Sequence, residues 1–410
     1  MSTRRSPAKQ RRLRASLRRT GLLPRPRALR GLLRLAENLP THGNDVELFF
    51  DGDQLFDRML ADIAAATTRV SLEMYMFLSD ETGMRFARAL AAKARTGVMV
   101  RVIVDAVGSF AAANRMFSDM QTAGVEVLVY HPIAPWRQRF ALFGRDHRKI
   151  LVIDGRIGYT GGVNIADLWT QRAPKGKPWR DTHARVAGPA AGDLELLFVE
   201  TWHRETGKLL PLERTIPREP LVPPASEGSI PQVYVIGSRG GLHTRIRRMY
   251  LIAIEHARQR IRITSSYFVP DGRIRAALYA ARARGVDISL LLPFESDVQI
   301  VNHASRYYFH GYLSRRLKIS LWRPSILHAK TMTVDDDWST IGSSNFDSFS
   351  FHRNLEANVF IVDPRIGQEL AKRFAEDLAE STPVELAEWR KRSLLERILQ
   401  RLAAMLRPWL

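Results

Sequence analysis

The residues in this chain that could do chemistry occur twice, in the same order and at the same spacing. The two sets are His147, Lys149, Asp154, Gly161 and Asn164, and then His328, Lys330, Asp335, Gly342 and Asn345. From His to Asn each set spans 18 positions without an insertion, the second set lies 181 residues after the first, and most positions between the shared residues differ. Three fixed letters occur easily by chance, but two copies in one register do not. The pattern indicates an internal duplication that kept its chemical residues.

A phosphate pocket is the chemistry that these residue types favour. Alternate residues of a strand point to one face, so His147 lies beside Lys149, and His328 beside Lys330. An asparagine then follows a turn of small residues, where backbone N–H groups can approach an anion closely. A histidine surrounded by ammonium and amide donors can act on a phosphate as nucleophile or general acid. Two such half-pockets predict one composite site between two lobes.

The elements that must position these residues alternate between strands and helices. Strands are expected at 46–50, 69–77, 98–105 and 125–130, and helices at 54–67, 83–95 and 117–123. The stretches 260–268, 285–292 and 318–322 repeat the strands of the first half. This alternation predicts an α/β fold in which each half has a mixed, mostly parallel sheet flanked by helices.

Composition limits the alternatives. A chain of 410 residues accommodates two domains, and the absence of cysteine excludes disulfides, thiolate metal sites and a cysteine nucleophile. The net charge is +20, but residues 1–36 hold 12 Lys or Arg and no acid, while residues 384–410 hold six basic and three acidic groups, which leaves +5 for the body. We divide the chain into a basic tail (1–42), a first lobe (43–206), a proline-rich linker (207–231), a second lobe (232–382) and an amphipathic C-terminal helix (383–410).

The tail mixes arginine with leucine and has no aromatic residues. This composition suits an anionic lipid surface better than single-stranded nucleic acid, which binds aromatic platforms. A solvated disordered arm and an organellar transit peptide are the alternatives. No run reaches the roughly 18 apolar residues needed to cross a bilayer, so we expect the protein to lie on a membrane rather than to span it.

Two further segments allow a membrane interpretation beside a simpler one. The loop from Ala134 to Phe143 is aromatic and basic, and is either a packed connection or a lipid-facing lip. Near the C-terminus, apolar side chains recur at helical spacing opposite Arg390, Arg392, Arg397 and Arg401, which predicts a helix docked on the second lobe or lying in a membrane plane. The apolar set is Leu394, Leu395, Ile398, Leu399, Leu402, Met405, Leu406 and Trp409.

The duplicated HxKxxxxD motif, followed by Gly-Gly-x-Asn or Gly-Ser-x-Asn, resembles the phospholipase D superfamily over roughly residues 43–382. The run Trp179–His183, the chain length and the basic ends are most similar to bacterial cardiolipin synthases. The resemblance implies two pseudo-symmetric α/β lobes with one active site at their interface, and neither metal nor cofactor.

The resemblance also implies residue roles. His147 and His328 would divide the exchange of a phosphodiester: one forms a phosphohistidine, and the other protonates the leaving alkoxide and deprotonates the acceptor, with His147 the favoured nucleophile. The nonbridging oxygens would be held by Lys149, Lys330, Asn164 and Asn345. Within the catalytic motif, Asp154 and Asp335 would be structural anchors. Orientation of the imidazoles would fall to Glu356 and, in the lengthened first copy, to Asp181.

Three functions remain at this stage. The first is a phosphatidyltransferase that makes cardiolipin from phosphatidylglycerol, peripheral on the cytoplasmic face of the bacterial inner membrane, with phosphatidylethanolamine open as a donor and no obligate protein partner. The second is a hydrolase, either a phospholipase D or a nuclease. The third is a non-catalytic membrane-binding protein. Complete motifs in both halves argue against the third, and charge confined to the tails argues against nucleic acid as a partner. Transferase and lipase share the phosphohistidine and are not separated by sequence.

The charge distribution generates a test. Deleting residues 1–36 should weaken binding to anionic vesicles without unfolding the body, because each basic residue near such a surface contributes about 1 kcal/mol. Raised salt should reproduce the effect on the full-length chain. Vesicle co-sedimentation, with circular dichroism as the folding control, measures both; unchanged sedimentation would leave the tail as a solvated arm.

Overall fold

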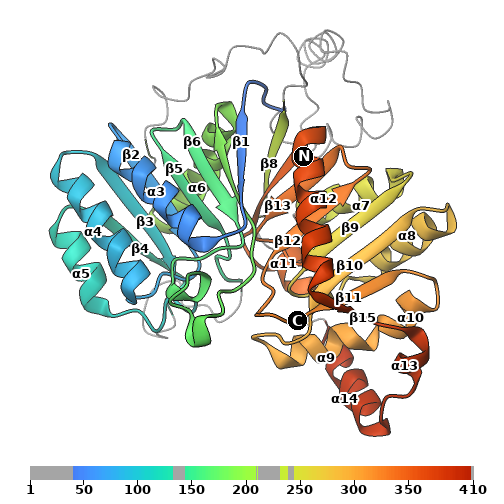
Figure 1. The fold of residues 1–410 in the computed structure, drawn as a ribbon. Helices are drawn as coiled ribbons and strands as arrows, with labels where there is room; N and C mark the ends of the chain where they lie inside the picture. Colours follow the sequence, from blue (N-terminus) through green and yellow to red (C-terminus); the bar gives the residue numbers. More distant parts are fainter. Residues whose placement is uncertain (1–39, 133–143, 209, 211–230, 239–243, 408–410) are drawn as a thin grey trace.

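Two sheets lie side by side, each with helices packed on it (Figure 1). The computed structural model describes residues 40–132, 144–208, 210, 231–238 and 244–407. The expected lip at 134–143, nearly all of the basic tail, most of the linker and Trp409 lie outside these residues. In the part of the chain that is described, no helix is long and apolar enough to cross a bilayer.

The first lobe has the strand order β1-β7-β6-β5-β2-β3-β4. Its strands are β1 (Asp45–Phe49), β2 (Arg69–Met74), β3 (Met99–Asp105), β4 (Glu126–Tyr130), β5 (Lys149–Ile153), β6 (Ile157–Gly161) and β7 (His183–Ala187). Its helices are α3 (Gly52–Ala65), α4 (Glu81–Arg95), α5 (Asn114–Thr122) and α6 (Pro189–Thr206), with short 3-10 turns at Asp167–Trp169 and Pro174–Gly176.

The second lobe repeats this plan with the order β15-β11-β10-β9-β12-β13-β14-β8. Its strands are β8 (Gln232–Gly237), β9 (Arg260–Ser265), β10 (Asp287–Pro293), β11 (Lys318–Trp322), β12 (Lys330–Val334), β13 (Trp338–Gly342), β14 (Ala357–Val362) and β15 (Ser381–Pro383). Its helices are α7 (Arg245–His256), α8 (Gly272–Ala283), α9 (Gln299–Tyr307), α10 (Phe309–Leu313), α11 (Ser348–His352) and α12 (Pro364–Ala379).

The expected two-lobed α/β architecture is confirmed, but the sheets are not mostly parallel. Parallel pairing joins only β2, β3 and β4 in the first lobe and β9, β10 and β11 in the second; every other described pairing is antiparallel. The cause lies in the motif itself. A tight turn at Asp154 and Gly155 joins β5 directly to β6, and strands joined by so short a turn must run antiparallel.

Two helices of the first lobe begin where an aspartate side chain accepts a hydrogen bond from a free backbone N–H. Asp51 caps α3 through the N–H of Gln54, and Asp80 caps α4 through the N–H of Gly83. Both helices turn an apolar face onto β2 and β3, and the resulting core is fully buried. Its largest contributors are Leu55, Phe56, Ile63, Phe86, Leu90, Val70, Leu72 and Val102.

The lobes share a core of their own. Val186 of β7 packs in one buried cluster with Ile341 of β13 and Val359 of β14, and Ile150 of β5 packs with Ala357 of β14. Strands β5 and β7 of the first lobe thus pack against β13 and β14 of the second. This contact fixes the relative position of the two lobes where the motifs meet.

The C-terminal segment is not one continuous helix. It forms α13 (Leu386–Arg390) and α14 (Leu394–Met405), separated at Ser393, which caps α14 in a reciprocal capping box with Glu396. Ala403 of α14 is buried in a cluster with Val301 and Ala304 of α9, so the segment docks on the second lobe. Most of its apolar side chains are nevertheless exposed.

The motif aspartates lie at the far end of the motif strands from the histidines. Asp154 follows β5 with φ +53°, and its carboxylate accepts hydrogen bonds of 2.7–2.9 Å from the backbone and hydroxyl groups of Thr67 and Thr68 and from the N–H of Arg69. Asp335, at φ +54°, accepts the N–H groups of Arg258, Gln259 and Arg260 in the same way. Each carboxylate fastens the start of the neighbouring strand to the end of the motif strand.

These hydrogen bonds hold the pKa of Asp154 well below its ordinary value, although burial opposes them. A carboxyl group whose pKa is lower in the folded than in the unfolded protein stabilises the fold at pH values above its unfolded pKa, near 3.9. This stabilisation is lost as the pH falls towards the folded pKa. Asp154→Asn should therefore lower the free energy of unfolding by about 1–2 kcal/mol at pH 7, and the difference from wild type should shrink below about pH 4. Asparagine tolerates positive φ, so the backbone is not strained.

Urea denaturation across this pH range measures the effect. Asp119→Asn is the control, because Asp119 is exposed and its ion pair with Arg115 at 3.9 Å contributes little. An Asp154→Asn difference that did not change with pH would contradict the anchoring role.

Candidate active site

A cavity of about 390 Å³ opens between the lobes, and residues of both motifs line it. From the sequence-predicted set it contains both histidines, His147 and His328, and both asparagines, Asn164 and Asn345. The other side chains around it are Tyr75, Met76, Arg145, Trp169, Trp179, Tyr267, Asp297, Val298, Val301, Asp347, Phe349, Ser350 and Asn354. The duplication therefore forms one site, not two.

Each histidine is held by the other lobe. Nδ1 of His147, in the first lobe, lies 3.1 Å from Oε2 of Glu356, in the second. Nδ1 of His328, in the second lobe, lies 2.6 Å from Oδ2 of Asp181, in the first. The two carboxylates predicted to orient the imidazoles thus do so crosswise.

The backbone repeats this exchange. The N–H of His147 donates to the carbonyl of Leu355 at 2.9 Å, and the N–H of His328 donates to the carbonyl of Arg180 at 2.8 Å. Leu355 and Arg180 immediately precede Glu356 and Asp181. One short segment from each lobe therefore fixes both the main chain and the ring of the histidine opposite.

The two carboxylates differ in their other contacts. Asp181 also accepts hydrogen bonds from Nε1 of Trp169 at 3.1 Å and from the N–H of Thr182 at 2.8 Å. A Cβ at Gly162 would lie 2.0 Å from its Oδ1, so only glycine allows this approach. Ser343, at the equivalent position of the second motif, instead donates its hydroxyl to Glu356. The second glycine of Gly-Gly thus leaves room for Asp181, and the serine of Gly-Ser donates a hydrogen bond to Glu356.

Both motif lysines are buried beneath the cavity and do not line it. Nζ of Lys149 donates to the carbonyl of His147 at 2.7 Å, and Nζ of Lys330 donates to the carbonyl of His328. Burial lowers the pKa of Lys149 to about 7 and that of Lys330 to about 8. They contribute positive charge under the histidines and brace the backbone that carries them.

The asparagines use their amide oxygens to bind the protein. Oδ1 of Asn164 accepts the N–H of Met76 at 3.1 Å, and Oδ1 of Asn345 accepts the hydroxyl of Ser266 at 2.7 Å. Because the oxygen of each side-chain amide is bound to the protein, its NH₂ group is turned away from that contact. The NH₂ donors are left for a ligand in the cavity.

The electrostatics distinguish the two halves. Burial, reinforced by Lys149, Lys330 and His328, holds the pKa of His147 well below its ordinary value, and burial raises the pKa of its partner Glu356 to about 7. The pKa of His328 is lowered by burial and by Lys330, but the Asp181 carboxylate opposes the change; the pKa of Asp181 itself is depressed, chiefly by His328. At His147, the lowered histidine pKa and the raised carboxyl pKa both favour the uncharged forms of the two groups. At His328, the depressed pKa of Asp181 favours its ionised form.

Several aromatic residues of the site were not identified from sequence. The ring of Tyr75 lies edge-on to His147, with centroids 4.9 Å apart, and Trp169 and Trp179 lie 5.6 and 5.5 Å from His328. Tyr267 donates its hydroxyl to Asp297 at 2.7 Å. Tyr75 and Tyr267 occur within the two strands expected at 69–77 and 260–268, and that repeat was the available signal.

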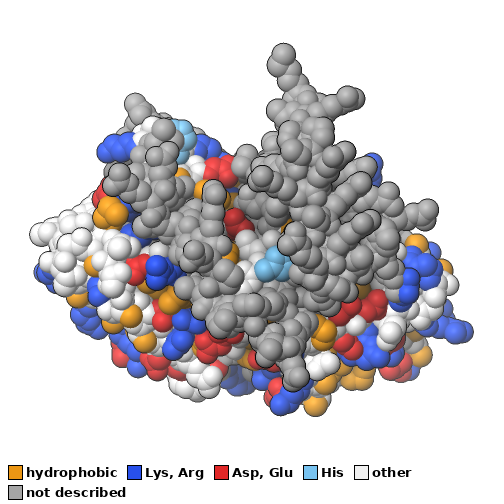
Figure 2. Space-filling model, turned by 90° about the horizontal axis from the view of Figure 1, so that it is seen from above, with side chains coloured by type: hydrophobic (Ala, Val, Ile, Leu, Met, Phe, Trp, Pro, Cys, Tyr) orange, Lys and Arg blue, Asp and Glu red, His pale blue; other side chains and the backbone are white. Residues whose placement is uncertain are grey.

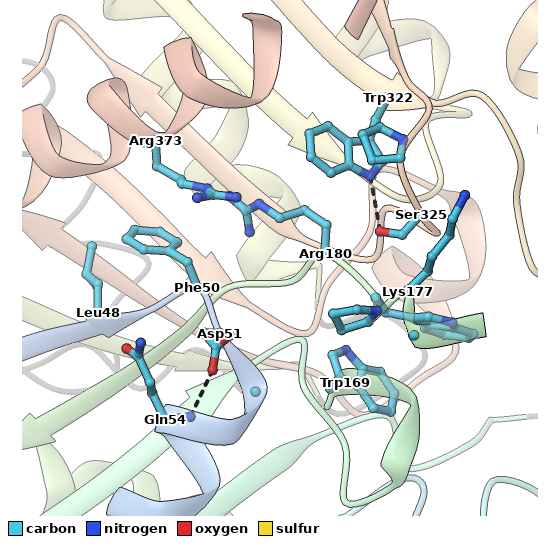
Figure 3. Close-up of a pocket in the computed structure, with 15 residues that line it drawn as sticks. Leu48, Phe50, Asp51, Gln54, Trp169, Lys177, Arg180, Trp322, Ser325 and Arg373 are labelled. Carbon is cyan, nitrogen blue, oxygen red and sulfur yellow. Dashed lines mark hydrogen bonds between the residues drawn. The ribbon is translucent and has the colours of Figure 1, made fainter. Parts of the chain in front are cut away.

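A larger hollow, of about 670 Å³, lies beside this cavity and shares the wall formed by Trp169 and Trp179 (Figure 3). Neither motif histidine lines it. Two of its cations, Arg180 and Arg373, share the carboxylate of Asp377, at 2.7 and 3.0 Å. The smaller cavity, which holds the titratable pairs, is the candidate active site.

Comparison with known proteins agrees with this geometry. Residues 59–173 and 250–378 match the family model described as "Cardiolipin synthase, PLD-like domain". A cardiolipin synthase of Geobacillus kaustophilus is 34% identical over 95% of this chain and 78% of its own length, and cardiolipin synthase A of Pseudomonas fluorescens is 33% identical over 93% and 78%.

Among solved structures, the fold is similar to that of phosphatidylserine synthase from Haemophilus influenzae. The TM-score is 0.69 over 93% of this chain and 97% of that one, at 15% sequence identity. The regions that match the family model contain both motifs and Glu356, and Asp181 lies between the two regions. The chain belongs to the cardiolipin synthase family, and so to the phosphatidyltransferases of the phospholipase D superfamily.

Proposed function

We propose that this protein makes cardiolipin at a membrane surface by transferring a phosphatidyl group from one phosphatidylglycerol to the free hydroxyl of another. The observation that carries this proposal is the pair of imidazoles in one cavity, each held at Nδ1 by a carboxylate of the opposite lobe. Because Nδ1 is engaged, Nε2 is the nitrogen that reacts. Two such nitrogens facing one phosphorus can perform a double displacement.

The first displacement releases glycerol. Nε2 of His147 attacks the phosphorus of the donor lipid, forming a P–N bond, while the P–O bond to the glycerol headgroup breaks. The leaving oxygen takes a proton from the His328 imidazolium. The second displacement reverses these roles: neutral His328 removes the proton of the acceptor hydroxyl, whose oxygen attacks phosphorus, and the P–N bond breaks. Two phosphatidylglycerols become one cardiolipin and one glycerol.

The electrostatic difference between the halves supports this assignment. A nucleophilic imidazole must be unprotonated, and the pKa of His147 is held well below its ordinary value by burial and the nearby cations. A general acid must carry a proton, and only His328 faces a carboxylate whose pKa is depressed. Glu356, whose pKa is raised to about 7, can accept a hydrogen bond from the Nδ1–H of His147 as positive charge develops on that ring.

Charge on the nonbridging oxygens grows as phosphorus becomes five-coordinate. The NH₂ groups of Asn164 and Asn345 are the donors placed in the cavity to receive it, and Lys149 and Lys330 supply positive charge beneath. Aromatic rings on both histidines restrict water, which would otherwise divert the phosphohistidine to phosphatidic acid. We place the enzyme on the cytoplasmic face of the bacterial inner membrane, and leave open whether phosphatidylethanolamine also donates.

The division of roles generates a test on His328. Asp181→Asn removes the anion that favours its protonated form, so the pKa of His328 should fall by about 1 to 2. The alkaline limb of the pH–kcat profile should move to lower pH in parallel, with kcat reduced on the order of 10²-fold. Histidine NMR titration and the pH profile measure both. Glu356→Gln is the matched control, since it leaves the Asp181 carboxylate beside His328 in place. If the alkaline limb moved equally in both variants, the assignment of His328 as the general acid would be contradicted.

Product analysis tests the reaction. Vesicles of phosphatidylglycerol should yield cardiolipin and glycerol in equal amounts, with phosphatidic acid minor, because the acceptor hydroxyl reaches the intermediate from the membrane plane at high effective concentration. Mass spectrometry of the lipid extract measures the ratio. Phosphatidic acid as the dominant product would establish a lipase, and cleavage of DNA without lipid turnover a nuclease.

The same assay contains its control. His147→Ala and His328→Ala should each abolish turnover, and mixing the two variants should not restore it, because both histidines belong to one cavity of one chain. Turnover by either variant alone would remove that histidine from the double displacement.

A further inference from the structure

The helix α14 presents an apolar stripe that the rest of the described fold does not cover. Seven large side chains are between 43% and 73% exposed, although a helix docked for stability alone would bury them. They are Leu394, Leu395, Ile398, Leu399, Leu402, Met405 and Leu406. At 100° per residue they fall within an arc of about 140°, so they form one continuous face.

The helix is built to stand with that face outward. Its capping box starts it at Leu394 independently of any partner. Only Gln400 and Ala403 of α14 are buried, and they occupy the side next to the stripe, against α9. The preceding α13 is held by Trp389, whose ring packs on Phe309 of α10 with centroids 5.1 Å apart. The segment is thus anchored at two points while the stripe remains free.

The buried side of α14 packs against the wall of the catalytic cavity. Ala403 packs in one cluster with Val301 and Tyr267, and both of these residues line the cavity. At the start of α9, Val298 and Ile300 are also exposed, by 38% and 41%, and Val298 lines the cavity. One layer of side chains therefore separates the stripe from the reacting groups.

A second apolar projection lies on the first lobe. Phe110 is 73% exposed and Val107 is 42% exposed, in the turn after β3. Ser109 of the same turn donates its hydroxyl to the carbonyl of Tyr75, at the cavity wall beside His147. Exposed apolar side chains of both lobes thus lie next in the chain to residues that line the cavity or contact its wall. In Figure 1, α9 and α14 lie at the lower end of the molecule.

Charge around the stripe identifies what covers it. Arg397 and Arg401 lie on the edge of α14 away from α9, both exposed, and Arg390, Lys391 and Arg392 lie just before the helix. An exposed apolar face bordered by arginine suits the boundary between acyl chains and anionic headgroups. Seen from above in Figure 2, hydrophobic, basic and acidic side chains are all visible along the uncovered edge of the molecule.

We propose that α14, together with α9 and the Val107–Phe110 turn, is the surface by which this enzyme docks on an anionic bilayer with its cavity mouth facing the lipid. This proposal rests on the proposed phospholipid substrate. The docked orientation lets donor and acceptor lipids enter from the membrane plane. A second copy of the chain, or a segment of the chain outside the described residues, is the competing occupant and is an outcome of the test.

The absence of cysteine allows a direct experiment. Single-cysteine variants Leu402→Cys, Phe110→Cys and Met99→Cys carry an environment-sensitive NBD label. Met99 is the matched control: it is 46% exposed, but it begins β3 at the end of that strand away from the cavity. On adding phosphatidylglycerol–phosphatidylcholine vesicles, emission should shift to the blue and intensify at positions 402 and 110, not at 99. No change at 402, or equal changes at all three, would overturn the proposal.

A label at 402 that is already shielded without vesicles, in a manner that depends on protein concentration, would identify a second copy instead. Shielding that is independent of concentration but relieved by deleting residues 1–36 would identify the chain's own tail. Either result would overturn the bilayer as occupant.

Activity then separates this proposal from the proposed function. Leu395→Ser/Ile398→Ser/Leu402→Ser/Met405→Ser should lose at least about tenfold in vesicle binding and in turnover of vesicle lipid. It should retain turnover of monomeric short-chain phosphatidylglycerol, because the cavity is intact. If the variant lost turnover of both substrates equally, the docking role would be overturned. If the wild-type protein turned over neither substrate, the proposed function would be overturned, but the NBD emission would still report whether α14 docks on vesicles. Leu196→Ser, elsewhere on the surface, is the control for lost exposed apolar area.

Discussion

The structure depends on a reciprocal exchange between its lobes. Glu356 crosses to His147 and Asp181 crosses to His328, and the carbonyl before each carboxylate receives the backbone N–H of the same histidine. Neither half can orient its own imidazole. Because the four groups are buried, each would be costly to leave unpaired, and the packing of Val186 against Ile341 and Val359 is what keeps them in register.

The same exchange creates a functional difference from a symmetric plan. Both histidines carry a carboxylate on Nδ1, yet Asp181 gains an indole N–H and a backbone N–H, while Glu356 lies in surroundings that raise its pKa to about 7. The carboxylate that faces His328 therefore has a depressed pKa, and the one that faces His147 has a raised pKa. A duplicated sequence thereby obtains one group suited to attack and one suited to proton transfer.

The position of the site relates this chemistry to its substrate. The cavity opens at one end of the molecule, and the cluster behind its wall includes the residue that anchors α14. The proposed docking surface and the cavity thus lie on neighbouring layers of one core. A substrate that never leaves the membrane requires such proximity, since its headgroup can travel only a short way from the acyl chains.

The sequence by itself determined the duplication, the strand–helix alternation and which histidines and asparagines meet in one cavity. Local pattern carries these, because the spacing from His to Asn is the same in both copies. Its expectation of mostly parallel sheets was wrong, since the short turn at Asp154 imposes a hairpin. Local pattern also could not identify Tyr75 or Trp169, whose contacts with the histidines join residues far apart in the chain.

Only the tertiary structure decided which carboxylate serves which histidine. Asp181 lies 147 residues from His328, and Glu356 lies 209 residues from His147. No spacing rule reaches so far, because the pairing follows from the contact between sheets and not from the chain. The exposure of α14 was decided in the same way: its periodicity predicts an apolar face, but only the docking of Ala403 on α9 shows that this face points outward.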